Sequence, residues 1–350
     1  MTDLSIQRIT TGIPGLDVIL DGGFVAQQAY LVRGGMGTGK TTLGLHFLTE
    51  GIRRGESTLF ISLMRRKADI LLHAASMGFD IQGIALLDLS PSPELFSEMQ
   101  TSHIFPPAEI ERAPLMRKIT EQIEATHPHR ICVDAITQLR YLAMDEFEFR
   151  RLMLAFLRFL QEQHATVLLP AEVDGAVSEE SLPFLCDGVL TLRKTAEGRS
   201  VEVEKLLGSG FHAGRHSLRL TETGITVYPR LVVPEQRCPF TGEIIPSGVT
   251  ALDALLDGGI ERGLVTIISG PSGTGKSLLS LLFAKEAATR GERSAIFLFE
   301  ETRAPLLKRA ERLGMPLAAM LEASTLSVTH VAPADYLPDE FTALVRREVE

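Results

Sequence analysis

The sequence predicts an α/β protein built from two tandem copies of one unit, each a parallel β-sheet flanked by helices, with the second copy truncated in this chain. A long segment recurs at a fixed interval of 236 residues, which indicates an internal repeat. Each copy also carries a glycine-rich loop between an apolar run and a helical pattern. A third observation is an acidic residue that ends an apolar strand in the first copy, where open α/β sheets bind ligands.

The repeat opens with a similar stretch in each copy. TGIPGLDVILDGGF at 11–24 returns as SGVTALDALLDGGI at 247–260, and seven of the twelve positions from Gly12 to Gly23 are identical. The interval persists without a gap as far as Gly78, which is too long for chance. The predicted organisation is a first domain over residues 1–232, a proline-containing linker over 233–246, and the N-terminal part of a second domain over 247–350.

Both copies contain the phosphate-loop pattern G-x-x-x-x-G-K-[S/T], as GGMGTGKT at 34–41 and GPSGTGKS at 270–277. A short apolar strand is expected before each loop, AYLV in the first copy and LVTIIS in the second. A helix is expected after each loop, because apolar residues recur at helical spacing. The apolar faces of these helices are Leu43, Phe47 and Leu48 in the first copy, and Leu279, Leu282 and Phe283 in the second.

The residue types in these loops suit a nucleotide. Glycines let backbone N–H groups turn inward around a phosphate, Lys40 and Lys276 can reach the β- and γ-phosphates, and hydroxyls can bind Mg²⁺. The alternative is a glycine turn that does no more than cap a helix. The predicted ATP-binding residues are Gly37, Thr38, Gly39, Lys40, Thr41, Thr42, Gly273, Thr274, Gly275, Lys276, Ser277 and Leu278.

Asp134 ends the apolar strand in HRICVDAITQL, after a helix with Leu115, Ile119 and Ile123 at a spacing of four. A carboxylate at this edge of a parallel sheet can hold the shell of a magnesium ion. The alternative is a solvated aspartate at a strand end. The predicted metal-binding residues are Thr41, Asp134 and Ser277.

Together these motifs resemble the KaiC family, a branch of the RecA-like P-loop ATPases. The resemblance rests on TGIPGLDVILDGG, GGMGTGKTT, ICVDAITQL and KLLGSGFHAGRHSLRLTETGITVYPR, in that order. It implies two tandem RecA-like domains, ATP and Mg²⁺ as cofactors, ATP hydrolysis, and a homo-oligomeric ring, a hexamer, with nucleotide between neighbouring subunits. In clock members it also implies autophosphorylation in the second domain, which in this protein would need a longer chain.

The resemblance also implies roles for further residues. Glu300 and Glu301 match the catalytic glutamate pair, whereas the first copy has Met64 and Arg65 there. Lys205 opens a segment that reaches a neighbour's site in the family, although the family's arginine is a leucine here. Ser76 matches a position that contacts nucleotide.

The departure at Met64 and Arg65 yields a hypothesis about turnover. Neither side chain can act as a general base, so the first site is expected to hold ATP and hydrolyse it slowly. Arg65 or Arg66 would then help to hold the charge of the nucleotide. The alternative is that Arg65 to Lys67 form a solvated turn that points away from the site.

The net charge of −9 does not favour nucleic-acid binding, and no run approaches the length of a membrane span. Three widely spaced cysteines and the lack of a signal segment favour a cytoplasmic protein with reduced thiols. The proline-rich stretch 90–114 favours an irregular surface loop, and the alternative is a segment that docks a regulatory protein partner. His127 and His129 favour a solvated turn over a metal site.

Two rival functions are a RecA- or RadA-type DNA-dependent ATPase and a non-enzymatic, ATP-dependent oligomeric sensor. The sequence does not name the output.

Overall fold

The computed structural model describes residues 6–91, 107–173, 182–232 and 242–350. The chain divides into two compact units, Met1–Arg230 and Leu231–Glu350, called unit one and unit two below. Cys132 and Cys186 are buried free thiols. Cys238 and most of the proline-rich stretch lie outside the described residues.

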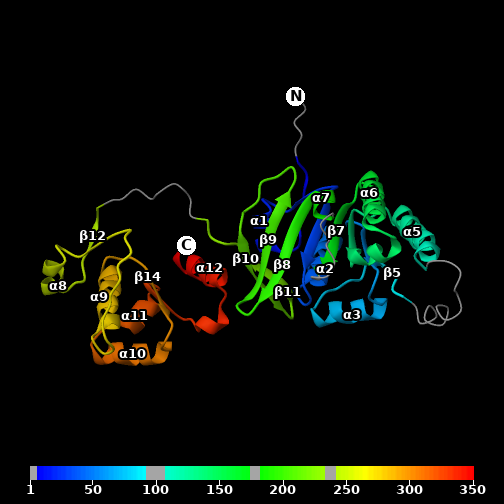
Figure 1. The fold of residues 1–350 in the computed structure, drawn as a ribbon. Helices are drawn as coiled ribbons and strands as arrows, with labels where there is room; N and C mark the ends of the chain where they lie inside the picture. Colours follow the sequence, from blue (N-terminus) through cyan, green and yellow to red (C-terminus); the bar gives the residue numbers. More distant parts are fainter. Residues whose placement is uncertain (1–5, 92–106, 174–181, 233–241) are drawn as a thin grey trace. The chain divides into compact units, whose positions relative to one another are not determined.

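Unit one is built on a nine-stranded sheet with the strand order β11-β10-β9-β8-β3-β7-β6-β4-β5 (Figure 1). Neighbouring strands from β8 to β5 in this order are parallel, and β9, β10 and β11 extend the sheet with antiparallel pairs. The predicted α/β class is therefore confirmed. The strands are β3 (Ala29–Gly34), β4 (Thr58–Ser62), β5 (Ile84–Asp88), β6 (Arg130–Asp134), β7 (Thr166–Glu172), β8 (Gly188–Thr195), β9 (Gly198–Leu206), β10 (Arg215–Thr221) and β11 (Gly224–Tyr228).

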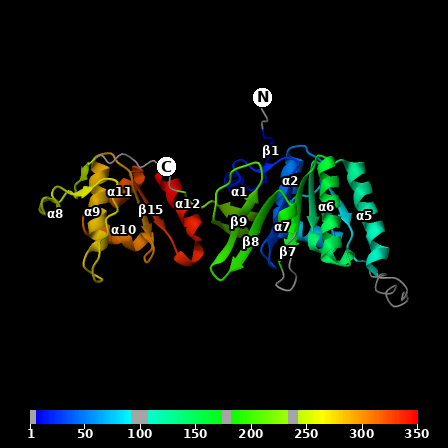
Figure 2. The same cartoon turned by 45° about the horizontal axis from the view of Figure 1, so that its top comes forward.

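Helices cover both faces of this sheet. Successive side chains of β3 point to opposite faces, so Tyr30 and Val32 join one apolar core while Leu31 joins the other. Helix α2 packs on the first face through the predicted residues Leu43, Phe47 and Leu48, and α5 and α6 lie beside each other on the second (Figure 2). The helices are α1 (Pro14–Ile19), α2 (Lys40–Arg53), α3 (Lys67–Ser76), α5 (Pro107–Thr126), η1 (Ile136–Leu142), α6 (Glu146–Glu162) and α7 (Leu182–Leu185).

Unit two repeats the local structure of unit one. The pair β12–β13 matches β1 (Arg8–Ile9) with β2 (Phe24–Val25), and α9, β14 and α10 match α2, β4 and α3 at the 236-residue interval. β12 falls inside the expected linker, so the repeat starts earlier than the sequence indicated. The elements are β12 (Ile244–Ile245), α8 (Thr250–Leu255), β13 (Ile260–Glu261), α9 (Lys276–Thr289), β14 (Ser294–Leu298), α10 (Arg303–Arg312), α11 (Leu317–Glu322), β15 (Leu326–His330), η2 (Pro333–Asp335) and α12 (Pro338–Val349).

The sheet of unit two differs from that of unit one. Among the described residues, β14 pairs with β15 alone, and the predicted strand LVTIIS at 264–269 does not form. Val265 and Ile267 are instead 94% and 85% exposed. In unit one the matching strand β3 pairs with β7 and β8, and residues 247–350 contain no counterpart of either strand. Without those neighbours the backbone of 264–269 has no ladder to join.

The apolar face predicted for α9 is only partly correct, since of its three residues Leu282 alone packs against the core of unit two. Leu279, Leu282 and Phe283 are only partly buried, because the strands that would cover them are absent from this unit. The helix instead buries Leu281, Ala284 and Ala287, and Leu281 and Ala284 join the core of unit two.

Candidate nucleotide-binding site

The phosphate loop of unit one joins the end of β3 to the start of α2. Gly37 and Gly39 have φ angles of 68° and 106°, in the left-handed region where a side chain would strain the backbone. This conformation starts α2 at Lys40 and turns the N-terminus of the helix toward the loop. A helix N-terminus and inward-turned N–H groups suit a phosphate. We call this loop, with the pocket beside it, site one.

Side-chain hydrogen bonds to its carbonyls hold the loop in this conformation. The Lys40 ammonium donates to the carbonyls of Gly34 at 2.8 Å and Gly35 at 2.9 Å, and the Thr38 hydroxyl donates to Gly35 at 2.9 Å. Lys40 is 8% exposed, so its charge is held directly over the loop. The Arg199 guanidinium, which sequence reasoning missed, donates to the Gly37 carbonyl at 3.1 Å.

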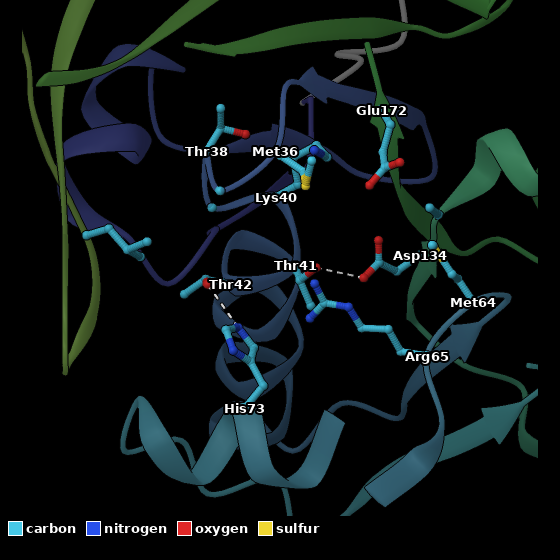
Figure 3. Close-up of a pocket in the computed structure, with 14 residues that line it drawn as sticks. Met36, Thr38, Lys40, Thr41, Thr42, Met64, Arg65, His73, Asp134 and Glu172 are labelled. Carbon is cyan, nitrogen blue, oxygen red and sulfur yellow. Dashed lines mark hydrogen bonds between the residues drawn. The ribbon is translucent and has the colours of Figure 1, made fainter. Parts of the chain in front are cut away.

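Thr41 and Asp134 meet as the sequence predicts. The Thr41 hydroxyl donates to a carboxylate oxygen of Asp134 at 2.8 Å (Figure 3). Burial raises the pKa of the Asp134 carboxyl, against the Thr41 hydrogen bond and the charge of Arg65. A hydroxyl and a carboxylate are oxygen donors of the kind that Mg²⁺ prefers, so this pair fits a magnesium ion bound with a triphosphate.

The strand order explains how the remaining residues gather here. β7, β6 and β4 follow β3 in the sheet, so their carboxyl ends meet beside the loop. Glu172 from β7, Asp134 from β6, and Met64 and Arg65 after β4 line one pocket with Lys40 (Figure 3). Glu172 is not among the predicted site residues, although TVLLPAE is an apolar run that ends in a carboxylate, the same signal that marks Asp134.

Met64 and Arg65 are fixed beside the pocket by a short turn. The Ser62 hydroxyl donates to the Arg65 carbonyl at 2.6 Å and accepts from the Arg65 N–H at 3.1 Å. Arg65 extends into the pocket (Figure 3), while Arg66 pairs with Asp69 at 3.1 Å outside it. The alternative in which the whole turn points away therefore does not hold for Arg65.

Helix α3 contributes His73 rather than the predicted Ser76. His73 lines the pocket, and its Nε2 lies 3.2 Å from the Thr42 hydroxyl (Figure 3). Burial lowers the pKa of His73, and the charge of Arg65 lowers it further. Ser76 lies one turn later, is exposed, and donates to the His73 carbonyl at 2.8 Å.

Lys205 lies away from the phosphate loop of its own chain. Its ammonium donates to the carbonyls of Cys186 at 2.7 Å and Pro183 at 3.3 Å. A contact between Lys205 and the nucleotide of a neighbouring subunit stays a prediction.

The phosphate loop of unit two, called site two, repeats the first loop. The Lys276 ammonium donates to the carbonyls of Gly270 and Pro271 at 2.8 Å, and the Thr274 hydroxyl donates to Pro271 at 2.9 Å. Gly275 keeps the left-handed φ of its counterpart, at 91°. Lys276, Thr274, Gly275 and Leu278 line a shared hollow, with Gly273 and Ser277 adjacent in the chain.

Glu300 and Glu301 are not brought into that hollow. Glu301 instead forms a two-point ion pair with Arg309, at 2.6 and 2.9 Å. In unit one the equivalent strand tip reaches the loop because β6 and β7 set the spacing of the sheet. Unit two has no such strands among its described residues, so nothing aligns its strand tip with its loop.

The expectations about His129 and about membrane spans can be compared with the described residues. His129 bonds through Nδ1 to the Ser57 hydroxyl at 2.8 Å, and no group of three or more metal-ligating side chains is found among the residues described. In the same part of the chain, no helix is both long and apolar enough to cross a membrane.

Comparisons with known proteins identify the family of this chain. The family model described as "ATPase: KaiC" matches residues 9–232 and 245–340. The chain is 28% identical over 363 residues to the circadian clock oscillator protein KaiC of Parasynechococcus marenigrum (strain WH8102), covering 99% of this chain and 69% of that protein. It is 27% identical over 360 residues to that of Synechococcus elongatus (strain ATCC 33912 / PCC 7942 / FACHB-805), covering 99% and 68%. The chain therefore belongs to the KaiC family of ATPases.

Proposed function

We propose that this protein is an ATP-binding ring ATPase with a regulatory or signalling role, whose first site holds ATP·Mg²⁺ and hydrolyses it slowly. The supporting observation is the strand tip after β4, where Met64 and Arg65 share a pocket with Lys40 and Asp134. A carboxylate in that position can orient and deprotonate the attacking water. Methionine has no basic atom, and arginine stays protonated.

Each remaining group of site one has a role in binding. Lys40 and the loop N–H groups would hold the phosphates, and Thr41 and Asp134 would hold Mg²⁺, which neutralises phosphate charge when bound. By resemblance, Glu300 and Glu301 match the missing carboxylates in the second copy, so we assign hydrolysis to site two, although Glu301 is paired with Arg309 in this structure.

The proposal extends to assembly and organisation. We propose a first domain over residues 1–232 and a second whose repeat begins at β12 (Ile244–Ile245) and runs to 350, and an ATP-dependent homo-oligomer, a hexamer, in the cytoplasm. The family membership supports the ring, since its KaiC relatives match nearly the whole of this chain. Light scattering with saturating ATP tests it, and a monomer under those conditions contradicts it.

The test of slow hydrolysis restores the missing base. In a Lys276→Ala chain, which removes phosphate binding at site two, the double change Met64→Glu with Arg65→Glu installs the pair found at Glu300 and Glu301. We expect phosphate release to rise by about 10²- to 10⁴-fold, the usual contribution of a general base.

Two variants complete this experiment. Met64→Gln with Arg65→Gln removes the cation without adding a base, so it should leave the rate low. Glu172→Gln tests the other carboxylate of the pocket. The proposal would be overturned if the Lys276→Ala chain released phosphate fast and adding Glu172→Gln abolished that release. Glu172 would then be the base.

A further inference from the structure

The carboxyl edge of the unit-one sheet carries two carboxylates between two cations. Following the strand order, Lys40 comes after β3, Glu172 ends β7, Asp134 ends β6 and Arg65 follows β4. One cation thus lies on each side of the two carboxylates. Lys40 belongs to the phosphate-loop motif, whereas Arg65 has no part in it.

The backbone of Arg65 is tied to the strand that carries Asp134. Ser62 lies opposite Asp134 in the β4–β6 register, and the N–H of Leu63 donates to the Asp134 carbonyl at 2.7 Å. Ser62 is 2% exposed and holds Arg65 through both of its hydroxyl contacts. Leu298 stands at the matching position of unit two and cannot form this turn. Arg65 is therefore held in place by a hydrogen-bonded turn to Ser62, a residue that unit two replaces with Leu298.

The guanidinium of Arg65 remains available for a ligand. It points toward Thr41 and Asp134 (Figure 3). Within the described ranges it forms no ion pair within 4 Å, whereas its neighbour Arg66 is paired with Asp69. Its charge still acts on Asp134, because it lowers the pKa of that carboxyl. A guanidinium presents a planar fork of donors that fits phosphate oxygens with two parallel hydrogen bonds.

We propose that Arg65 is a phosphate ligand of site one that supplies part of the positive charge otherwise provided by Mg²⁺, so that this site keeps ATP when Mg²⁺ is removed. The inference rests on the proposed binding of ATP at site one. The pocket would then hold two fixed cations from the protein, Lys40 and Arg65, on either side of the Thr41–Asp134 pair.

The test measures binding rather than turnover. ATP affinity of the full Lys276→Ala chain is determined by calorimetry, once with Mg²⁺ and once with EDTA, and compared with that of the same chain carrying Arg65→Gln. The matched control is Arg66→Gln, which removes the same charge one residue away, outside the pocket. Thermal unfolding of each variant confirms that it is folded.

We expect Arg65→Gln to lose about 10- to 100-fold more affinity than its parent when Mg²⁺ is removed, the range for a hydrogen bond to a charged group. Arg66→Gln should respond like the parent. Equal losses in the parent and in Arg65→Gln would overturn the inference and leave the proposed function intact. Failure of the Lys276→Ala chain to bind ATP even with Mg²⁺ would overturn both.

Discussion

Units one and two share their local structure but not their sheets. Matching residues form the same turn before the first helix: Thr11 N–H donates to Asp17 at 2.7 Å, and Ser247 N–H donates to Asp253 at the same distance. The phosphate loops and the helices that follow them also occur at matching positions of the two units. Yet β3 is buried in the middle of nine strands, while the matching segment 264–269 is exposed and unpaired.

This difference shows that the phosphate loop depends on residues close to it in the chain, whereas the position of the strand tip after β4 depends on distant ones. The loop depends on glycines and a helix start that lie within a few residues of one another, so both units form it. The alignment of the β4 tip with the loop depends on β6 and β7, which come later in the chain. A short motif thus forms the phosphate loop, and a long stretch of chain determines which side chains lie beside it.

Amide hydrogen exchange should show the largest contrast between the units. The amides of residues 29–34 are expected to exchange at least about 10³-fold more slowly than those of 264–269, because central strands open only with most of the unfolding free energy of a domain. Helices α2 and α9 serve as the internal control, since both keep their hydrogen bonds. Similar protection of the two segments would contradict the comparison.

The next largest contrast is expected in acid, where the stability of unit one should fall because of His46. Its Nε2 accepts the Ile225 N–H at 2.8 Å, and burial lowers the pKa of His46 to about 4. The unfolded state binds more protons between pH 6.5 and 4, so the stability of unit one should fall by up to about 3 kcal/mol as the pH drops through that window. Leu282 stands at the matching position of unit two and does not titrate.

The variant His46→Gln keeps an acceptor for Ile225 and removes the titration. Denaturant unfolding of this variant across the same pH range should therefore give a flatter stability curve than the parent chain. An unchanged pH dependence would show that other groups of unit one cause the loss.

Exchanging a glycine between the repeats should give the smallest effect. Gly51 lies in α2 where unit two has Ala287, and a Cβ at Gly51 would lie 2.7 Å from Thr58 and 2.8 Å from the Arg130 side chain. Arg130 is fully buried and cannot move aside easily, because it donates to the carbonyls of Thr10 and Phe47. Gly51→Ala should therefore destabilise unit one by about 1–2 kcal/mol, despite the better helix propensity of alanine.

The reverse change, Ala287→Gly, meets no such contact and should cost about 1 kcal/mol from helix propensity. Urea unfolding followed by probes in each unit measures both. A stabilising Gly51→Ala would show that the α2–β6 packing is looser than these distances indicate.

The part of the fold that sequence predicts well is the part set by short-range patterns. The repeat, the helix with Leu43, Phe47 and Leu48, and the strand that ends at Asp134 all depend on spacing within about twenty residues. The prediction at LVTIIS failed because an apolar run needs partner strands, and pairing is a property of distant segments. Glu172 ends an apolar run as Asp134 does, but its place beside Lys40 follows from the strand order.

His73 and Arg199 illustrate a second limit. Their residue types and positions carry no signal until α3 and the β8–β9 hairpin are placed around the loop. Ser76 was favoured by resemblance, and the helix turns it outward while His73 faces the pocket. A single turn of helix decides which of the two can meet a ligand.

The interleaved order of the central strands also bears on how the chain is made. β3 and β4 emerge early from a ribosome, but the strands that lie between them end only at Glu172, about 110 residues after Ser62. At common rates of synthesis this is a wait of roughly 5 to 20 seconds, during which apolar strands stay without neighbours. Such long-range pairing slows folding and leaves the nascent chain open to aggregation. The complete pocket of site one, with Asp134 and Glu172 beside Lys40, can therefore form only after the chain has passed residue 172.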